Sequence, residues 1–193
     1  MTQLKRRSFL QLAATALPSS LFARTLLSQT PSQTAPSTAP PPAPLHTGED
    51  RYGLKRSLPN ATTAFKVSSK DCRGDFFAME HHHTSKGGPR LHLHHNEDEW
   101  FYVIEGEYIA EVGGKLHHLK AGDSLLGPRG VSHTFAFVGA GTGRLLITYA
   151  PAGKMEEYFD LLERPGTVNP YTDSAEHLRT YGIELLGPAL SVT

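Results

Sequence analysis

Residues 87–106 read GGPRLHLHHNEDEWFYVIEG, and this stretch decides which fold we expect. It begins with a Gly-Gly-Pro turn, after which polar and apolar residues alternate up to His95. The turn residues 96–98 then lead into a second run of strand-forming residues. Successive side chains of a strand point to opposite faces, so His92 and His94 share one face, with Cα atoms roughly 7 Å apart. The stretch therefore predicts two short strands that carry a pair of imidazoles on one side.

Turn residues divide the chain from residue 49 onward into short β segments. Clusters such as Gly113-Gly114 and residues 127–130 separate them at a spacing typical of antiparallel sandwiches and barrels. After Pro151, apolar residues recur at helical spacing from Met155 to Leu162 and again from Ala175, which predicts one or two short helices. The fold class is all-β with short C-terminal helices. We expect strands at residues 65–68, 76–82, 90–95, 99–105, 107–112, 115–119, 123–126, 133–137 and 144–149.

The composition excludes several classes of protein. The chain has 193 residues, and its 19 Lys and Arg balance 19 Asp and Glu, so there is no electrostatic basis for nucleic-acid binding. Its one cysteine, Cys72, excludes an intramolecular disulfide and any Cys-rich metal site. A metal in this protein must therefore be held by histidine and carboxylate side chains.

The first 27 residues have the composition of an export signal. They contain four basic residues and no acid, and residues 9–23 are uncharged. These 15 residues are interrupted by polar side chains and are too short to be a stable membrane span, which needs about 20 mostly apolar residues. Residues 28–48 are rich in Pro, Ser, Thr and Ala, which predicts a disordered linker. The folded domain should then occupy residues 49–164, followed by a helical extension at 165–193.

The run Lys5-Arg6-Arg7-Ser8-Phe9-Leu10 resembles a twin-arginine signal. That resemblance implies recognition by the twin-arginine export machinery and a periplasmic or extracellular location. A generic secretory signal or a basic amphipathic start is the alternative interpretation.

Two further residues are candidates to complete a metal site with His92 and His94. Glu99 starts the next strand after a turn, which allows its carboxylate to face back toward the two histidines. His133 opens a later strand after the turn residues Gly122, Pro128 and Gly130, and it could supply a fourth ligand.

These residues resemble the two motifs of the cupin superfamily. The first motif is matched by His92, His94, Glu99 and Gly106, and the second by Gly122, Pro128, Gly130 and His133. Phe137 stands where the second motif often ends in Asn. The resemblance implies a cupin jelly-roll barrel, also called a double-stranded β-helix. It also implies one divalent transition metal held by His92, His94, Glu99 and His133. Three imidazoles and one carboxylate suit Fe, Mn, Ni, Co, Cu or Zn, so the sequence does not select the metal.

The stretch 87–106 is especially similar to single-domain cupins of the quercetin 2,3-dioxygenase-like type. This similarity implies a dioxygenase whose partners are O2 and a small phenolic, flavonol or enol-like substrate. Glu99 would then be the catalytic residue, acting as a ligand that also accepts the substrate's hydroxyl proton. Two alternatives stay open, a cupin that binds a metal or small molecule without turnover and a cupin isomerase.

Strand alternation predicts which other side chains share the metal-facing side. These are Arg90, Phe101, Val103, Phe135 and Phe137, which would give a substrate pocket that is apolar with one cation. The alternative is that the apolar residues simply fill the barrel, as in other small barrels. Alternation also splits residues 81–83 between two faces, which favours surface or supporting histidines. Residues 100–104 suggest a hydrophobic strand edge through which a homodimer could extend its sheet.

Overall fold

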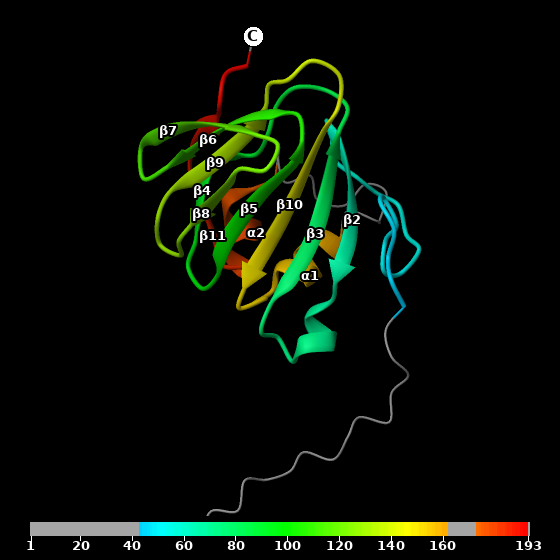
Figure 1. The fold of residues 1–193 in the computed structure, drawn as a ribbon. Helices are drawn as coiled ribbons and strands as arrows, with labels where there is room; N and C mark the ends of the chain where they lie inside the picture. The colour runs from blue at the N-terminus through cyan, green and yellow to red at the C-terminus, as the bar shows by residue number, and fades with distance from the viewer. Residues whose placement is uncertain (1–42, 162–172, 193) are drawn as a thin grey trace, which may run out of the picture. The chain divides into compact units, whose positions relative to one another are not determined.

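The computed structural model describes residues 43–161 and 173–192 (Figure 1). The predicted signal segment at 1–27 and the linker up to residue 42 lie outside the described residues, as do Leu162 and the start of the predicted helical extension. No helix in the described part is long and apolar enough to cross a membrane.

Two antiparallel sheets make up the fold, as Figure 1 shows. The larger sheet has the strand order β1-β2-β3-β10-β5-β8. Its strands are β1 (Arg56–Ser57), β2 (Ala61–Val67), β3 (Phe77–His83), β10 (Gly143–Ala150), β5 (Asp98–Glu105) and β8 (Ser124–Gly127). The smaller sheet has the order β11-β4-β9-β6-β7. Its strands are β11 (Ile183–Ala189), β4 (Arg90–His94), β9 (His133–Phe137), β6 (Glu107–Val112) and β7 (Lys115–Lys120).

The core lies between the two sheets, because alternate residues of both turn inward. Met79 of β3 and Phe101 of β5 meet Tyr108 of β6 and Phe135 of β9 in one buried cluster. This arrangement confirms the predicted all-β fold class. Eight of the nine predicted strands agree with the structure to within one residue at each end. The largest difference is β2, which begins at Ala61 instead of Phe65 because its first residues are small and give a weak hydrophobic pattern.

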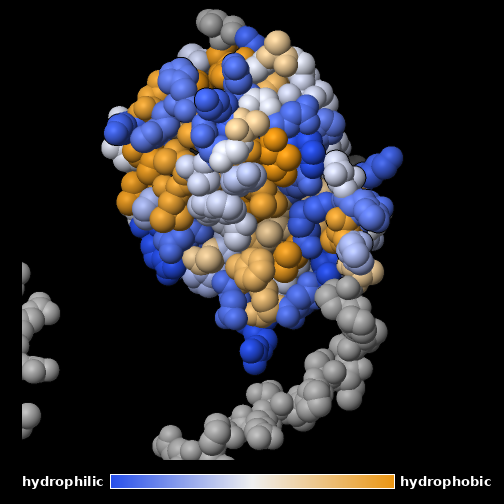
Figure 2. Space-filling view, in the orientation of Figure 1, coloured by the Kyte–Doolittle hydropathy of each residue, from blue (hydrophilic) through white to orange (hydrophobic). Residues whose placement is uncertain are grey.

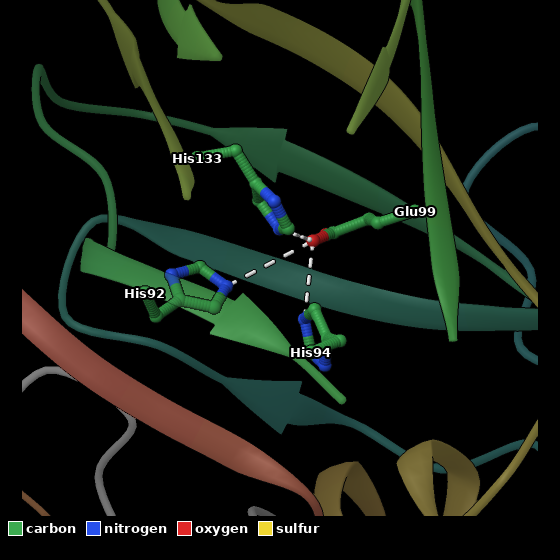
Figure 3. A group of neighbouring side chains, drawn as sticks. All are labelled: His92, His94, Glu99 and His133. Carbon is green, nitrogen blue, oxygen red and sulfur yellow. Dashed lines mark hydrogen bonds and ion pairs between the residues drawn. The ribbon is translucent and has the colours of Figure 1, made fainter. Parts of the chain in front are cut away.

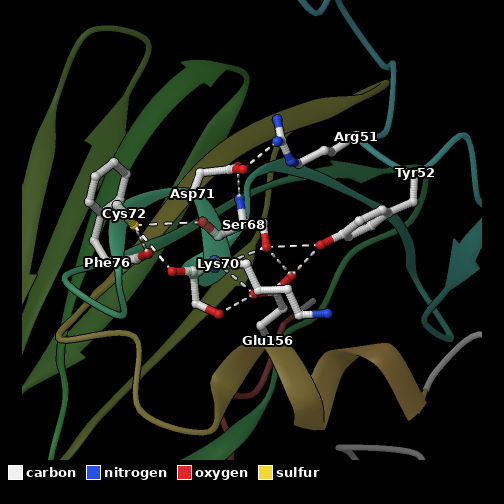
Figure 4. Close-up of polar contacts among 9 residues, drawn as sticks. Arg51, Tyr52, Ser68, Lys70, Asp71, Cys72, Phe76 and Glu156 are labelled. Carbon is white, nitrogen blue, oxygen red and sulfur yellow. Dashed lines mark hydrogen bonds and ion pairs between the residues drawn. The ribbon is translucent and has the colours of Figure 1, made fainter. Parts of the chain in front are cut away.

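Three short helices complete the described fold. The 3-10 helix η1 (Ser69–Cys72) follows β2, and α1 (Met155–Asp160) and α2 (Ala175–Thr180) follow the last strand of the larger sheet. Both predicted α-helical segments are confirmed. Glu156 of α1 accepts hydrogen bonds from the hydroxyls of Tyr52, Ser68 and Ser69, which ties α1 to η1 (Figure 4). This anchoring fixes the position of Tyr158 and Phe159, which α1 buries against the core.

The described part of the predicted helical extension differs from our expectation. It contains α2, but it continues into β11, which pairs with β4. In this register Ile183 lies opposite His94 and Leu185 lies opposite His92. The alternation of these two apolar residues with Glu184 is too short to stand out in the sequence, and pairing with β4 decides the conformation.

The expected strand edge at residues 100–104 is wrong. These residues belong to β5, which pairs with β10 on one side and β8 on the other, so β5 has no free edge. Their outward side chains Trp100 and Tyr102 stack at 5.8 Å between ring centroids and stay partly exposed. Figure 2 shows hydrophobic and hydrophilic groups intermixed across the face in view.

Candidate metal centre and its cavity

Four side chains from three strands meet inside the barrel (Figure 3). His92 and His94 come from β4, Glu99 from β5 and His133 from β9, and one ligand atom from each lies within 4.8 Å of all the others. The pairing of β4 with β9 places His92 directly opposite His133. The four residues predicted as metal ligands are therefore brought together, and all four are buried.

The carboxylate of Glu99 is the centre of this cluster. Its Oε2 lies 2.8 Å from Nε2 of His133, 3.2 Å from Nε2 of His94 and 3.8 Å from Nε2 of His92. Burial alone would raise the pKa of Glu99, but its contacts with the three imidazoles lower that pKa well below the ordinary value. The carboxylate is therefore ionised at neutral pH.

Backbone carbonyls fix the orientation of two of the imidazoles. Nδ1 of His92 donates to the carbonyl of Arg90 at 2.7 Å, and Nδ1 of His133 donates to that of Val131 at 2.9 Å. A carbonyl only accepts, so a proton sits on Nδ1 of each ring, and Nε2 is the nitrogen that faces Glu99. This is the tautomer that a metal-binding histidine needs.

A divalent cation fits this donor set. Lone pairs of two imidazoles and an ionised carboxylate repel one another unless a cation or a proton lies between them. Adjacent ligands about 2.1 Å from one metal are about 3 Å apart, and the three separations around Glu99 bracket that value. Burial lowers the pKa of His133, yet its hydrogen bond to Glu99 raises it overall, so a proton takes this place when no metal is bound.

His94 is held less tightly than its neighbours. Its Nδ1 lies 3.8 Å from Oε2 of Glu97, and neither atom has a hydrogen-bond partner among the described residues. Burial lowers the pKa of His94 to about 4 and so favours the neutral ring, which is the form that binds metal. Glu97 is therefore near the site without being a ligand, in agreement with the motif spacing that selects Glu99.

Tyr149 is a site residue that the sequence analysis missed. Its hydroxyl donates to Oε1 of Glu99 at 2.7 Å, which leaves Oε2 to face the three histidines. Tyr149 lies directly opposite Glu99 in the pairing of β10 with β5. Only knowledge of that pairing could have identified it, because the two residues are 50 positions apart.

The turn before His133 is shaped by two glycines. A Cβ on Gly127 would lie 2.9 Å from Nδ1 of His133, so the imidazole occupies the space that a side chain would fill. Gly130 has a φ of +73°, and its N–H donates to the carbonyl of His94 at 2.7 Å. This contact ties the second motif to the strand that carries the first two histidines.

A cavity opens beside the cluster. Its volume is about 50 Å³, and it is about 540 Å³ when the open space at its mouth is included. His92, His94 and Glu99 line it together with side chains from both sheets and both α-helices. The other lining residues are Leu58, His81, Pro89, Arg90, Phe135, Ile147, Tyr149, Tyr158, Phe159, Leu178, Ile183 and Leu185.

The predicted pocket residues divide into two groups. Arg90 and Phe135 line the cavity, as their strand positions predicted. Phe101, Val103 and Phe137 do not line it, and they are almost fully buried in the core. Alternation assigned the correct face to these three residues, but it does not distinguish the level of the cavity from deeper layers of the barrel.

The histidines at 81–83 are split between faces as expected, but two of them are interior residues. His81 and His83 are buried, whereas His82 is exposed. His83 contacts the hydroxyl of Tyr108 through Nδ1 at 3.0 Å, whereas His81 lines the cavity. Of the expected surface or supporting histidines, His82 is on the surface, whereas His81 and His83 are interior residues outside the ligand set.

Comparison with known proteins finds a family model that matches the middle of the chain. The family model described as "Cupin domain" matches residues 77–149, from β3 to β10, a range that includes all four candidate ligands. Residues 77–149 are thus similar to cupin domains, and they contain a buried His, His, Glu, His cluster suited to a metal.

Several solved structures are similar to the chain. KdgF from Halomonas sp. is 17% identical with a TM-score of 0.46, and the match covers 50% of this chain and 84% of that one. An RmlC-like cupin from Shewanella frigidimarina is 23% identical with a TM-score of 0.44, over 53% of this chain and 86% of that one. A predicted oxalate decarboxylase from Thermotoga maritima is 21% identical with a TM-score of 0.48, over 51% and 92%. The comparison with curated proteins found no match.

Proposed function

We propose that this protein is a metal-dependent dioxygenase that acts on a small phenolic, flavonol or enol-like substrate. The observation that supports it is the meeting of three imidazoles and the carboxylate of Glu99 at the wall of a largely apolar cavity. A redox-active divalent metal bound there would supply Lewis-acid and one-electron chemistry toward an oxygen-bearing substrate and O2. The similarity of residues 87–106 to quercetin 2,3-dioxygenase-like cupins favours oxygen chemistry over the other reactions of such sites.

The side chains around the cluster have distinct tasks in this proposal. Tyr149 holds Oε1 of Glu99, so the carboxylate presents Oε2 to the cavity in one orientation. Glu99 is ionised and accepts the hydroxyl proton of the substrate at Oε2, which turns the substrate into a more electron-rich anion. The apolar lining, which includes Phe135 and Ile147, excludes water from the reacting atoms and packs against a flat ring.

Oxygen uptake with a flavonol tests this proposal. The purified protein should contain close to one redox-active metal per chain, and with quercetin it should take up one O2 for each flavonol consumed. Glu99→Gln should abolish this uptake and retain part of the metal. Metal-loaded protein that binds quercetin without taking up oxygen would contradict the proposal and favour a binding cupin. Conversion of quercetin without oxygen uptake would instead favour an isomerase.

We also propose that the protein works after export through the twin-arginine route. The support is the sequence Lys5-Arg6-Arg7-Ser8-Phe9-Leu10 followed by a weakly hydrophobic stretch without acids. Cell fractionation of the full-length chain should find it in the periplasm or outside the cell. The double change R6K and R7K should retain it in the cytoplasm, and undiminished export of that variant would contradict the route.

A further inference from the structure

Two buried polar side chains line the cavity without a partner. Both ring nitrogens of His81 and the hydroxyl of Tyr158 have no hydrogen-bond partner within residues 43–161 and 173–192. His81 is 4% exposed and Tyr158 is 1% exposed, so bulk water does not solvate either side chain. Buried polar atoms that lack partners destabilise a fold, and in a cavity they indicate a group that binds there.

These two side chains lie outside the metal cluster but share its cavity. His81 comes from β3 of the larger sheet and Tyr158 from α1, whereas the ligands come from β4, β5 and β9. Aromatic rings surround His81, with ring centroids of Phe135 at 6.3 Å and Phe159 at 6.2 Å. The cavity therefore offers metal ligands and, from other elements of the fold, two hydrogen-bonding groups without partners.

Both groups are uncharged at neutral pH. Burial lowers the pKa of His81 to about 4, which leaves its ring neutral with one donor and one acceptor. Burial also raises the pKa of Tyr158 far above its ordinary value, so its hydroxyl stays protonated and can donate. Two neutral groups of this kind match an uncharged oxygen better than a carboxylate or phosphate.

We propose that His81 and Tyr158 form a second recognition site, which hydrogen-bonds a hydroxyl or carbonyl oxygen on the apolar part of the ligand. The ligand class is then an aromatic or enol-like compound with at least two oxygens, one for the metal centre and one for this pair. The role of the first oxygen rests on the proposed function, whereas the His81 and Tyr158 site is testable by binding alone.

Two probes of nearly equal size test the site. Phenol carries a hydroxyl and fluorobenzene does not, and their affinities can be measured by NMR titration of the purified, metal-loaded protein. Wild-type protein should bind phenol more tightly, and His81→Phe and Tyr158→Phe should each reduce that preference about fivefold, the effect of one lost neutral hydrogen bond. The affinity for fluorobenzene should change little in either variant.

Two controls separate this site from its surroundings. Tyr108→Phe removes the hydroxyl of a buried tyrosine that is not among the residues lining the cavity, and it should keep the preference for phenol. Wild-type protein from which the metal has been removed with a chelator should also keep it. Unfolding midpoints of all variants report whether each one folds.

The outcomes are decisive in each direction. Equal affinity of wild-type protein for the two probes, or no binding of either, overturns the site. A preference that survives in both His81→Phe and Tyr158→Phe but disappears in the metal-free protein assigns the selection to the metal centre and also overturns the site. A preference that depends on His81 and Tyr158 in a protein that takes up no oxygen would support the site and remove only the proposed reaction.

Discussion

Two buried carboxylates in this protein, Glu99 and Glu156, both have a lowered pKa, but the groups that contact them differ. Glu99 meets the Nε2 atoms of three imidazoles, and Glu156 meets the hydroxyls of Tyr52, Ser68 and Ser69 and the N–H of Ser69 (Figures 3 and 4). In both cases burial would raise the pKa and the polar neighbours lower it overall. A lowered pKa therefore does not tell the two sites apart.

The difference lies in which side supplies the protons. Around Glu156 every partner is a hydroxyl or N–H that donates, so the protein satisfies that carboxylate by itself. Around Glu99, Tyr149 donates to Oε1, but the rings of His92 and His133 use their Nδ1 protons on backbone carbonyls. Their Nε2 atoms can therefore donate to Oε2 only when the ring is charged. Glu99 thus belongs to a site that needs a cation, and Glu156 belongs to an anchor that needs none.

Removing a histidine from the cluster around Glu99 should have the largest effect, a loss of metal affinity. His133→Ala deletes the imidazole that lies 2.8 Å from Oε2 of Glu99, and metal affinity should fall by at least about a hundredfold. Elemental mass spectrometry of purified protein and competitive metal titration measure this loss. Glu156→Gln is the matched control and should keep the metal, so an equal loss in both variants would mean that the two carboxylates do not differ as argued.

Removing the charge of Glu156 should affect the stability of the protein instead of its metal content. Glu156→Gln leaves the donors of Ser68 and Ser69 without a charged acceptor, and the free energy of unfolding should fall by about 2–3 kcal/mol. Denaturant unfolding measures the change. Glu157→Gln, at an exposed neighbouring position, should stay within about 0.5 kcal/mol of wild type. A fall of similar size in both variants would attribute the effect to helix α1 in general.

The contrast also explains how much the sequence could predict. Short strands, turns and the ligand set follow from local patterns, because alternation puts His92 and His94 on one face and the motif spacing selects Glu99 and His133. Those four residues have come together as predicted. Pairing between distant strands is a different matter, since it depends on the whole sheet. Tyr149 reaches Glu99 only because β10 lies against β5.

The sequence also does not predict how deep inside the barrel each inward-facing side chain lies. Phe101 and Phe135 share a predicted face with the ligands, yet only Phe135 reaches the cavity. His81 and Tyr158 line one cavity because α1 packs its Phe159 against His81 of the larger sheet. In the smaller sheet, β11 joins β4 through a pattern too short to recognise. Sequence periodicity gives the side of a strand, whereas packing of remote elements gives the layer.

Tyr149→Phe should have a smaller effect on metal affinity, and it tests what orients the carboxylate of Glu99. The change removes one hydroxyl donor to Oε1 and keeps the ring, so the carboxylate loses its fixed orientation. Metal affinity should fall about tenfold, as when a group that orients a ligand is lost. Competitive metal titration measures it, with Tyr108→Phe as a control that loses a buried hydroxyl outside the cluster. Unchanged affinity would mean that the histidines alone orient Glu99.

The smallest of these effects is a pH-dependent change in the stability difference between wild type and Glu156→Gln. It should distinguish the anchor at Glu156 from the buried histidines. The pKa of Glu156 is lowered from 4.5, so its contribution to stability is complete above about pH 4.5 and is lost as the pH falls further. In metal-free protein, the gap between wild type and Glu156→Gln should therefore be constant from pH 7 to about 5 and narrow below about 4.5.

His81 provides the contrasting case in the same titration. Its pKa is lowered from 6.5 to about 4, so between these values the unfolded chain binds a proton that the folded chain does not. As the pH decreases from 6.5 to about 4, protonation of this group in the unfolded chain should lower the free energy of unfolding by up to about 1.4 kcal/mol per pH unit. The decrease should be equal in wild type and Glu156→Gln. Denaturant unfolding at a series of pH values separates the two windows. A gap that already narrows at pH 6 would show that Glu156 is coupled to the cavity, and the two carboxylate sites would then have to be treated as one.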